Sequence, residues 1–333
     1  MLSLNSCLQD AGPKSPDVSG IEVDLEINRF EQALFNLDTN QIDQELAELK
    51  EAFPEFTTIF FGQILGTTNA PISESDYIKG FINFPELRKL YDTCTVIYPN
   101  LDFLEKEMEE ALRYFKYYFP DESTPTLTTF ISEYSLGAFI YDENKLALGL
   151  DFFLGANYPY ARYVPGNPNF SDYLIRSFNK DHMTKKALKP LVEDIVGTAK
   201  GGRMIDFMIN AGKQLYMHES LQPKAPDSVL LEMTGAQCLW LLDNEIQVWA
   251  YLLQENLIYD AEWLKIRKFV EYAPNIPQMH PEAPGRSANW VGFQIVKAFM
   301  KNNPEVTLAE LVAIEDNQSI LDRSKYKPRR PRN

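Results

Sequence analysis

The chain has 333 residues and a mass of 38.3 kDa, and 45% of its residues are hydrophobic against 24% charged. This composition is typical of a folded protein with a large core, and it excludes a wholly disordered or fibrous chain. The 47 acidic and 32 basic residues give a formal net charge of −15, which disfavours binding to phosphate backbones, so no nucleic-acid partner is expected. The sequence contains no apolar run of about 18 residues, so no membrane-spanning helix is predicted.

The first residues contain a short motif around Cys7. In Leu4-Asn5-Ser6-Cys7 a branched apolar residue stands three positions before the cysteine and a small residue directly before it, as in the processing sites of bacterial lipoproteins. We therefore expect residues 1–20 to form a processing site and a flexible tether, with the lipid on Cys7. The basic and long apolar segments of a full signal peptide do not precede the motif, and an ordinary N-terminus with a chance match is the alternative.

The first third of the chain predicts one strand and several helices. Residues 21–27 alternate apolar and acidic side chains, which is the pattern of a half-buried strand. Apolar residues at helical spacing predict helices over residues 38–53, 85–91 and 101–119, and a proline directly follows the first and the last of these.

The middle of the chain changes to short segments rich in Thr, Ile, Phe and Leu. Residues 126–132, 137–141 and 145–151 predict strands, and Asp142-Glu143-Asn144 between the last two predicts the turn of a hairpin. An aromatic loop with prolines follows, over residues 158–165.

Beyond that loop the pattern is almost wholly helical. Helices are predicted over residues 171–178, 184–198, 203–221, 234–255, 260–271, 290–302 and 307–313. We therefore predict an α+β fold dominated by helices, with a small sheet in the N-terminal half. It forms a single domain over residues 21–322, and a basic tail follows over residues 323–333.

The sequence offers few residues for catalysis. Its only histidines are His182, His218 and His280, and the segment that begins His218-Glu219 has Gln222 where a zinc-peptidase HExxH motif needs its second histidine. Cys94 and Cys238 form no CxxC pair with each other or with Cys7, which disfavours a zinc ribbon or a disulfide framework. A zinc site built from His182, His218 and Glu219 is an alternative.

Two groups of aromatic residues have the composition of a binding surface. The first consists of Trp240, Trp249, Tyr251 and Trp263, which suit the stacking of sugars, although aromatic residues at near-helical spacing more often belong to a core. The second is the loop from Tyr158 to Tyr163. The basic tail either contacts anionic head groups or an acidic partner, or is simply solvated.

Four segments of the second half resemble, in order, the gliding-motility lipoprotein B (GldB) family of Bacteroidetes. They are residues 148–159 (LGLDFFLGANYP), 208–216 (MINAGKQLY), 284–296 (PGRSANWVGFQIV) and 324–328 (SKYKP). The resemblance implies an N-terminal lipidated cysteine, which agrees with the motif at Cys7.

The family is similar in layout to zincin-like peptidases, so the resemblance implies a zincin-like arrangement. Where such peptidases carry a Glu-Gly pair for the metal, this chain has Ala211 before Gly212. We therefore expect an inactive peptidase-like scaffold that is not an enzyme and binds no metal or cofactor. A cleft on this scaffold would be lined by residues of the family segments, namely Asp151, Lys213, Tyr216, Arg286 and Trp290.

The alternative is that these residues are structural. Trp290 would then belong to the core, Arg286 and Asp151 would form an ion pair, and Gly285 and Gly292 would serve a turn and a close packing contact.

The expected function follows from the resemblance. It is an outer-membrane lipoprotein that faces the periplasm and supports gliding and the associated secretion apparatus by binding envelope proteins. The alternatives are a zinc peptidase with unusual ligands and a binder of envelope glycans or peptides.

Overall fold

The computed structural model describes residues 15–276 and 279–329, and the chain divides into two compact units. We call Val23–Leu112 with Glu122–Leu191 the sheet unit. The described residues of Met1–Glu22, Arg113–Asp121 and Val192–Asn333 form the helical unit. This division does not test the single domain predicted over residues 21–322, which stays a prediction, as do the boundaries of the tether and the tail.

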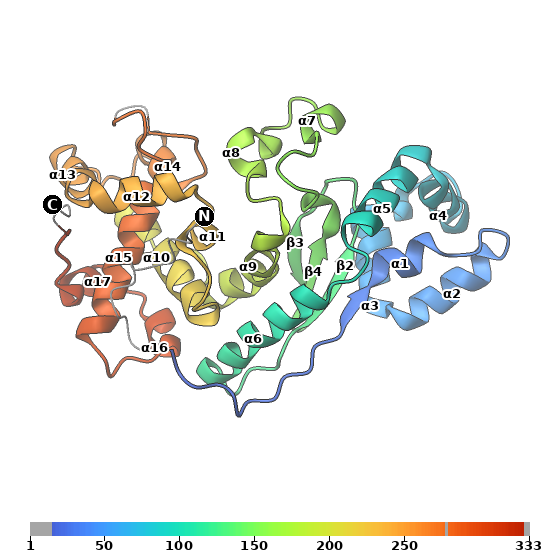
Figure 1. Ribbon diagram of the computed structural model, residues 1–333, viewed down its shortest axis with the longest axis horizontal. Helices are drawn as coiled ribbons and strands as arrows, with labels where there is room; N and C mark the ends of the chain where they lie inside the picture. Colours follow the sequence, from blue (N-terminus) through green and yellow to red (C-terminus); the bar gives the residue numbers. More distant parts are fainter. Residues whose placement is uncertain (1–14, 277–278, 330–333) are drawn as a thin grey trace, which may run out of the picture. The chain divides into compact units, whose positions relative to one another are not determined.

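The sheet unit is built on a four-stranded mixed sheet of order β1-β2-β4-β3 (Figure 1). Its strands are β1 (Ile27–Arg29), β2 (Thr126–Phe130), β3 (Ala138–Tyr141) and β4 (Lys145–Gly149). β2 pairs in parallel with β1 and with β4, and β3 pairs antiparallel with β4. The predicted hairpin is confirmed, and its turn carries Asp142 and Asn144 at positive φ, a conformation that Asp and Asn tolerate better than most residues.

The strand predicted over residues 21–27 is wrong in its extent. The alternation of burial is present, since Leu25 and Ile27 are buried while Asp24 and Glu26 are exposed. Residues 21–26 nevertheless have no partner strand, because the register with β2 begins only at Ile27 opposite Leu127. Alternation therefore predicted which side chains are buried, but the pairing with β2 begins only at the last residue of the alternating segment.

Helices supply most of the remaining sheet unit. They are α1 (Phe30–Phe35), α2 (Ile42–Ala52), α3 (Pro54–Ile59), a π-helical turn η1 (Phe60–Ile64), η2 (Thr67–Asn69), α4 (Glu74–Asn83), α5 (Pro85–Ile97), α6 (Asp102–Tyr118), η3 (Leu150–Phe152), α7 (Tyr160–Tyr163), η4 (Pro168–Phe170), α8 (Asp172–Ile175), η5 (Lys180–His182) and α9 (Met183–Val196). The boundary between the units falls within α6 and α9. Phe30, Phe56 and Phe60 are fully buried and pack edge-to-face or stacked, with ring centroids 4.7–5.9 Å apart.

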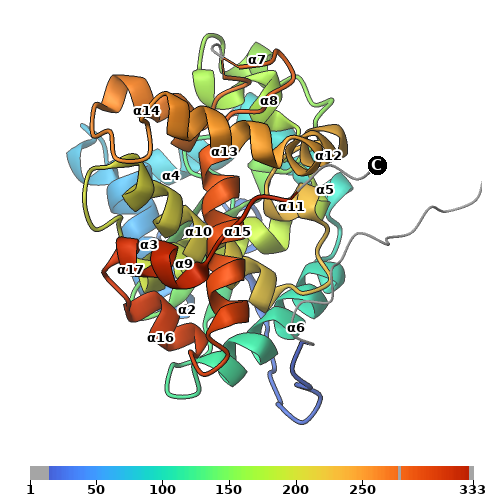
Figure 2. The ribbon, with the colours of Figure 1, turned by 90° about the vertical axis from the view of Figure 1, so that its left-hand side faces the viewer.

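The helical unit contains the other helices. They are α10 (Met204–Leu221), α11 (Asp227–Leu230), α12 (Gly235–Asp243), α13 (Glu245–Gln254), α14 (Trp263–Val270), α15 (Ser287–Asn302), α16 (Leu308–Ala313) and α17 (Asn317–Ser324). α10 and α15 lie side by side in both views and make the most extensive helix contact of this unit (Figures 1 and 2). The helix-dominated fold with a small sheet in the N-terminal half is thus confirmed.

The crossing of α10 and α15 depends on two glycines. A Cβ atom at Gly292 would lie 1.8 Å from the Met208 carbonyl oxygen, and one at Gly212 would lie 2.5 Å from the Gly292 carbonyl oxygen. The backbones can approach this closely only because neither residue has a side chain. The close packing considered for Gly292 is therefore present. Gly285 is equally confined, with its missing Cβ 2.1 Å from the Ala273 carbonyl oxygen.

The single helix predicted over residues 234–255 is wrong, because α12 and α13 are separated at Asn244. Asn244 leaves helical geometry at φ −114° and ψ 19°, and its side-chain Nδ2 donates to the Trp240 carbonyl at 2.8 Å. The Trp240 carbonyl also accepts from the backbone N–H of Asn244 at 2.9 Å, so the asparagine side chain adds a second hydrogen bond at the end of α12. Both helices contribute residues to the pocket described below.

As for the membrane, none of the helices in the described ranges combines the length and the apolar character that a bilayer crossing needs.

Candidate functional site

Lys213, in the second family segment, lies in the middle of α10 and is buried. Its Nζ donates to the backbone carbonyls of Val312 at 3.3 Å and Ile314 at 2.5 Å, at the C-terminal end of α16. An ammonium group there satisfies carbonyls that a helix end leaves open and interacts favourably with the helix dipole. Burial lowers the pKa of Lys213 to about 8. The contacts of this side chain therefore tie α10 to the end of α16.

The side chain of Arg286 contacts an aromatic ring and a backbone carbonyl within the helical unit. Its guanidinium lies 3.9 Å above the ring of Tyr272, and one of its nitrogens donates to the Leu231 carbonyl at 2.6 Å. The Tyr272 hydroxyl in turn donates to the buried carboxylate of Glu232 at 2.9 Å. Arg286 therefore joins the start of α15 to the segment after α11.

Trp290 and Tyr216 are the other two cleft candidates that lie in the helical unit. Trp290 is 3% exposed, as expected for a core residue. Tyr216 is partly buried on α10, and this burial raises the pKa of its hydroxyl to about 12, so the hydroxyl is neutral at ordinary pH.

Asp151, the remaining cleft candidate, belongs to the sheet unit and is completely buried. Its Oδ2 accepts hydrogen bonds from the backbone N–H groups of Tyr134 at 2.7 Å and Ser132 at 3.2 Å. Its Oδ1 is buried and accepts no hydrogen bond from another residue of the described chain. Burial raises the pKa of Asp151 to about 7. The carboxyl group thus holds a turn in which Glu133 and Tyr134 both have positive φ.

The five residues predicted to line one cleft are therefore divided between the two units. Asp151 lies in the sheet unit, and Lys213, Tyr216, Arg286 and Trp290 lie in the helical unit. Arg286 and Asp151, which were considered as an ion pair, each have the partners described above within their own unit. The cleft itself stays a prediction, and the contacts above describe what these side chains hold together.

The loop from Tyr158 to Tyr163 packs against its own unit. Tyr160 is completely buried, and the rings of Tyr158 and Tyr163 stack with centroids 5.6 Å apart. The Tyr158 hydroxyl is 2.7 Å from that of Tyr134. These aromatic faces are largely covered by one another.

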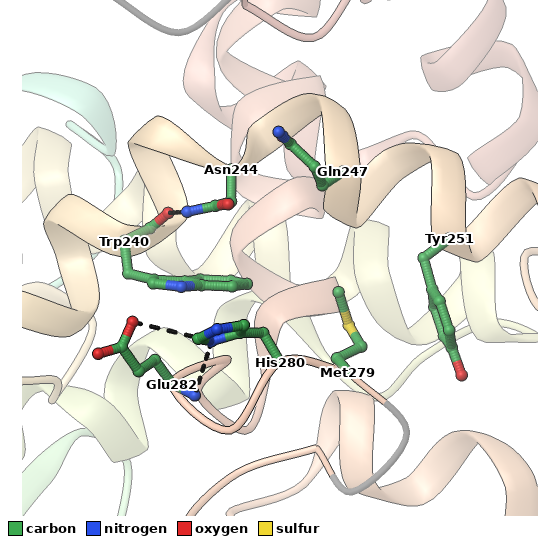
Figure 3. A pocket seen from close by; sticks show the side chains of 7 residues that line it. All are labelled: Trp240, Asn244, Gln247, Tyr251, Met279, His280 and Glu282. Carbon is green, nitrogen blue, oxygen red and sulfur yellow. Dashed lines mark hydrogen bonds and ion pairs between the residues drawn. The ribbon is translucent and has the colours of Figure 1, made fainter.

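A pocket of about 540 Å³ opens instead in the helical unit, between the α12–α13 pair and the loop that precedes α15 (Figure 3). This volume is in the range of small-ligand sites. The residues that line it are Trp240, Asn244, Gln247, Tyr251, Met279, His280 and Glu282.

The pocket is organised around a stacked pair of rings. The imidazole of His280 lies beneath the indole of Trp240, with centroids 6.3 Å apart and planes 25° from parallel (Figure 3). His280 Nδ1 accepts from the backbone N–H of Glu282 at 3.3 Å and lies 3.7 Å from the Glu282 carboxylate. Tyr251 lies at the opposite end of the pocket, with Met279 between it and His280.

Sequence reasoning had singled out two of the seven residues that line this pocket. Trp240 and Tyr251 were both candidates for a stacking surface, and they do line one pocket. The other two members of that group lie elsewhere, since Trp249 packs edge-on to Tyr326 and Trp263 packs near Phe207. His280 was noted only as a histidine. No local pattern linked the loop at residues 279–282 to helices about 40 positions earlier.

Within the described ranges, no three His, Cys, Asp or Glu side chains gather as they would around a metal ion. The alternative zinc ligands are His182 in the sheet unit and His218 with Glu219 in the helical unit. Glu219 forms an ion pair with Lys297 at 2.6 Å. Cys94 and Cys238 are buried thiols without a disulfide, and Cys7 lies outside the described residues.

The match to a known family covers nearly the whole chain. Residues 11–328 match the family model described as gliding motility protein GldB. The chain belongs to the GldB family. The resemblance inferred from the four segments is thereby confirmed, and GldB membership makes this a gliding-motility-associated protein of a lipoprotein family. No curated protein and no solved structure gave a significant match, so the zincin-like layout stays a prediction.

Proposed function

We propose that this chain is a lipid-anchored envelope protein, attached through Cys7 to the outer membrane and facing the periplasm. It supports the gliding machinery and the associated secretion apparatus by binding other envelope proteins. The observation that carries this proposal is the family match over residues 11–328. The processing motif at Cys7 supports the anchor.

A binding role rather than catalysis is supported by the contacts of the family segments. Lys213 is engaged by backbone carbonyls, Arg286 by Tyr272 and a carbonyl, and Asp151 by two backbone N–H groups. A catalytic group must be within hydrogen-bond reach of a substrate, whereas these groups are directed at their own fold. We therefore propose an inactive peptidase-like scaffold whose family-specific residues maintain its shape.

Deletion of the gene in the source organism tests the proposed role. Cell gliding, colony spreading and secretion should be lost and should return with the wild-type gene. Cys7→Ala, expressed at the same level, should restore less, because the protein would no longer be held at the membrane. A deletion strain that glides and secretes normally would remove the role, and full rescue by Cys7→Ala would remove the anchor.

The alternative of a zinc peptidase built on His182, His218 and Glu219 is tested by the metal content of the purified protein. Elemental mass spectrometry on protein purified without chelator or nickel resin should find substoichiometric zinc. Near-stoichiometric zinc that disappears in His218→Ala would overturn the non-catalytic proposal. The alternative of a glycan or peptide binder is tested by calorimetry with cell-wall fragments.

A further inference from the structure

The pocket of the helical unit combines aromatic walls with hydrogen-bond acceptors. Trp240 and Tyr251 supply π-faces at its two ends, and the imidazole of His280 extends the Trp240 stack (Figure 3). Aromatic rings around a small cavity attract cations through the negative electrostatic potential of their faces. The walls alone would also suit a sugar, so the polar lining decides between the two.

The charge of the lining favours a cation. Glu282 contributes a carboxylate whose side chain is 73% exposed, and the described lining contains no lysine or arginine. The partner of Glu282 is the imidazole of His280 at 3.7 Å, which is charged only when protonated. The chain as a whole carries a net charge of −15. An incoming cation is therefore attracted at long range and meets a carboxylate without a fixed positive charge beside it.

The remaining polar groups of the pocket include oxygen atoms that can accept hydrogen bonds. Asn244 donates its Nδ2 to the Trp240 carbonyl at 2.8 Å, which leaves Oδ1 as the oxygen that can accept from a ligand. Gln247 is exposed on the same rim, and the thioether of Met279 lies between His280 and Tyr251. A planar cation with several N–H donors on an apolar stem matches this arrangement better than an ammonium group does.

We propose that the pocket binds the side chain of an arginine presented by a partner protein. The guanidinium contacts the Trp240 and His280 stack and donates to Glu282 and Asn244, while the methylene stem covers Met279. The helical unit already holds one of its own arginines in this way, since Arg286 lies 3.9 Å above the Tyr272 ring and donates to a carbonyl. The proposed binding role enters this inference at one point, because it names a partner protein as the source of the arginine.

Methyl NMR on the full chain tests this proposal. The chain has nine methionines, so ¹³C-methyl labelling gives a simple spectrum, and Met279→Leu assigns the Met279 signal. Titration with N-acetyl-arginine methylamide should shift this signal with a dissociation constant in the roughly millimolar range. The lysine analogue should bind less tightly. The glutamine analogue and N-acetylglucosamine should leave the signal unchanged.

Two variants and a matched control locate the interaction. Glu282→Gln should weaken binding of the arginine probe roughly two- to fivefold, as for an exposed charge pair, and Glu282→Lys should weaken it further. Both variants change a largely exposed side chain, so we expect them to retain the fold. Glu305→Gln is the control, because its side chain is 69% exposed in the same unit and lies outside the pocket lining.

Several outcomes would overturn the proposal. An unchanged Met279 signal in tens of millimolar arginine probe would do so, as would equal binding of the glutamine analogue. Binding of N-acetylglucosamine that survives Glu282→Gln would assign the pocket to sugars. The deletion experiment is independent of this titration. If the deletion strain glides normally, the proposed function is wrong and arginine binding can still hold. If the deletion strain does not glide and the titration shows no arginine binding, only the assignment of the pocket is wrong.

Discussion

The two units use residues of the family segments in different ways to hold backbone segments together. In the helical unit, α10 and α15 approach until the missing Cβ of Gly292 would lie 1.8 Å from a carbonyl oxygen. In the sheet unit, the carboxyl group of Asp151 is buried in order to bind two backbone N–H groups. The helical unit has no side-chain atoms where α10 meets α15, and the sheet unit buries a carboxyl group at the turn over residues 132–134. Sequence similarity at Gly292 and Asp151 is therefore explained by the fold that these residues maintain.

Asp151 in the sheet unit and Lys213 in the helical unit are buried ionisable groups that carry opposite charges when ionised. Burial raises the pKa of Asp151 to about 7 and lowers that of Lys213 to about 8. In both cases the low dielectric disfavours the charged form, and backbone groups are the hydrogen-bond partners. Each group should respond differently to substitution and to pH.

The largest effect is expected for the glycine contact of the helical unit. Gly292→Ala places a methyl group against the Met208 carbonyl, and only a shift of α15 relative to α10 relieves this overlap. We expect a loss of about 3 kcal/mol or more in the free energy of unfolding, measured by urea denaturation.

Gly80→Ala in α4 is the matched control. It lies in an exposed part of a helix where an added Cβ meets no atom within 4 Å. Because alanine favours helices over glycine, this variant should be more stable by up to about 1 kcal/mol. Equal stability of Gly292→Ala and the wild type would show that the two helices do not meet as closely as described.

The second-largest effect is expected for the sheet unit. Asp151→Ala leaves the N–H groups of Ser132 and Tyr134 buried without their acceptor, at a cost of about 2–3 kcal/mol in unfolding free energy. Near pH 4, where the carboxyl group of folded wild type is protonated, Asp151→Asn keeps an acceptor oxygen and should cost about 1 kcal/mol or less. The exposed Asp92→Ala on α5 is the control and should unfold like the wild type. If the Ala and Asn variants are equally stable, the carboxyl group does not hold the turn.

A smaller effect is expected for Lys213→Met, which removes the donor to the carbonyls of Val312 and Ile314 but fills the same space. Methionine also removes the cost of burying an ammonium group, so we expect a net loss of about 1–2 kcal/mol in unfolding free energy. The exposed Lys301→Met on α15 should change stability by less than about 0.5 kcal/mol. A Lys213 variant as stable as the Lys301 variant would mean that the end of α16 does not depend on this contact.

The sequence predicted local features of the structure better than contacts between distant positions. The hairpin and the helices near residues 42–52, 102–118 and 204–221 follow from local periodicity and turn residues, and the structure confirms them. The parallel pairing of β1 with β2 joins positions about 100 residues apart, and no local pattern specifies such a pair. The break at Asn244 was missed because its apolar neighbours continue the helical spacing on both sides.

The candidate site shows the same limit. Trp240 and Tyr251 stood out as aromatic residues, but their meeting with His280 and Glu282 depends on how a loop folds back. The Tyr158–Tyr163 loop has a similar composition and covers its own rings. Composition alone therefore identified aromatic surfaces, and the surrounding fold decided which one borders a pocket.

The pH dependence of stability is the smallest effect when it is counted per pH unit. It also compares the two units directly. Asp151 has a higher pKa folded than unfolded, so its protonation stabilises the fold below about pH 4, and this contribution is lost as pH rises through about 7. Lys213 has a lower pKa folded than unfolded. Its contribution therefore becomes more favourable as pH rises from about 8 to about 10.5.

Each group can change the unfolding free energy by at most about 1.4 kcal/mol per pH unit. The differences between wild type and variants isolate these contributions, because the other titrating groups cancel. Relative to wild type, Asp151→Asn should gain stability between about pH 4 and 7, and Lys213→Met should lose it between about pH 8 and 10.5. Urea midpoints across this range provide the measurement. Parallel curves for wild type and Asp151→Asn would mean that the carboxyl group is solvated in the folded state, and the contrast between the two units would then rest on the glycine contact alone.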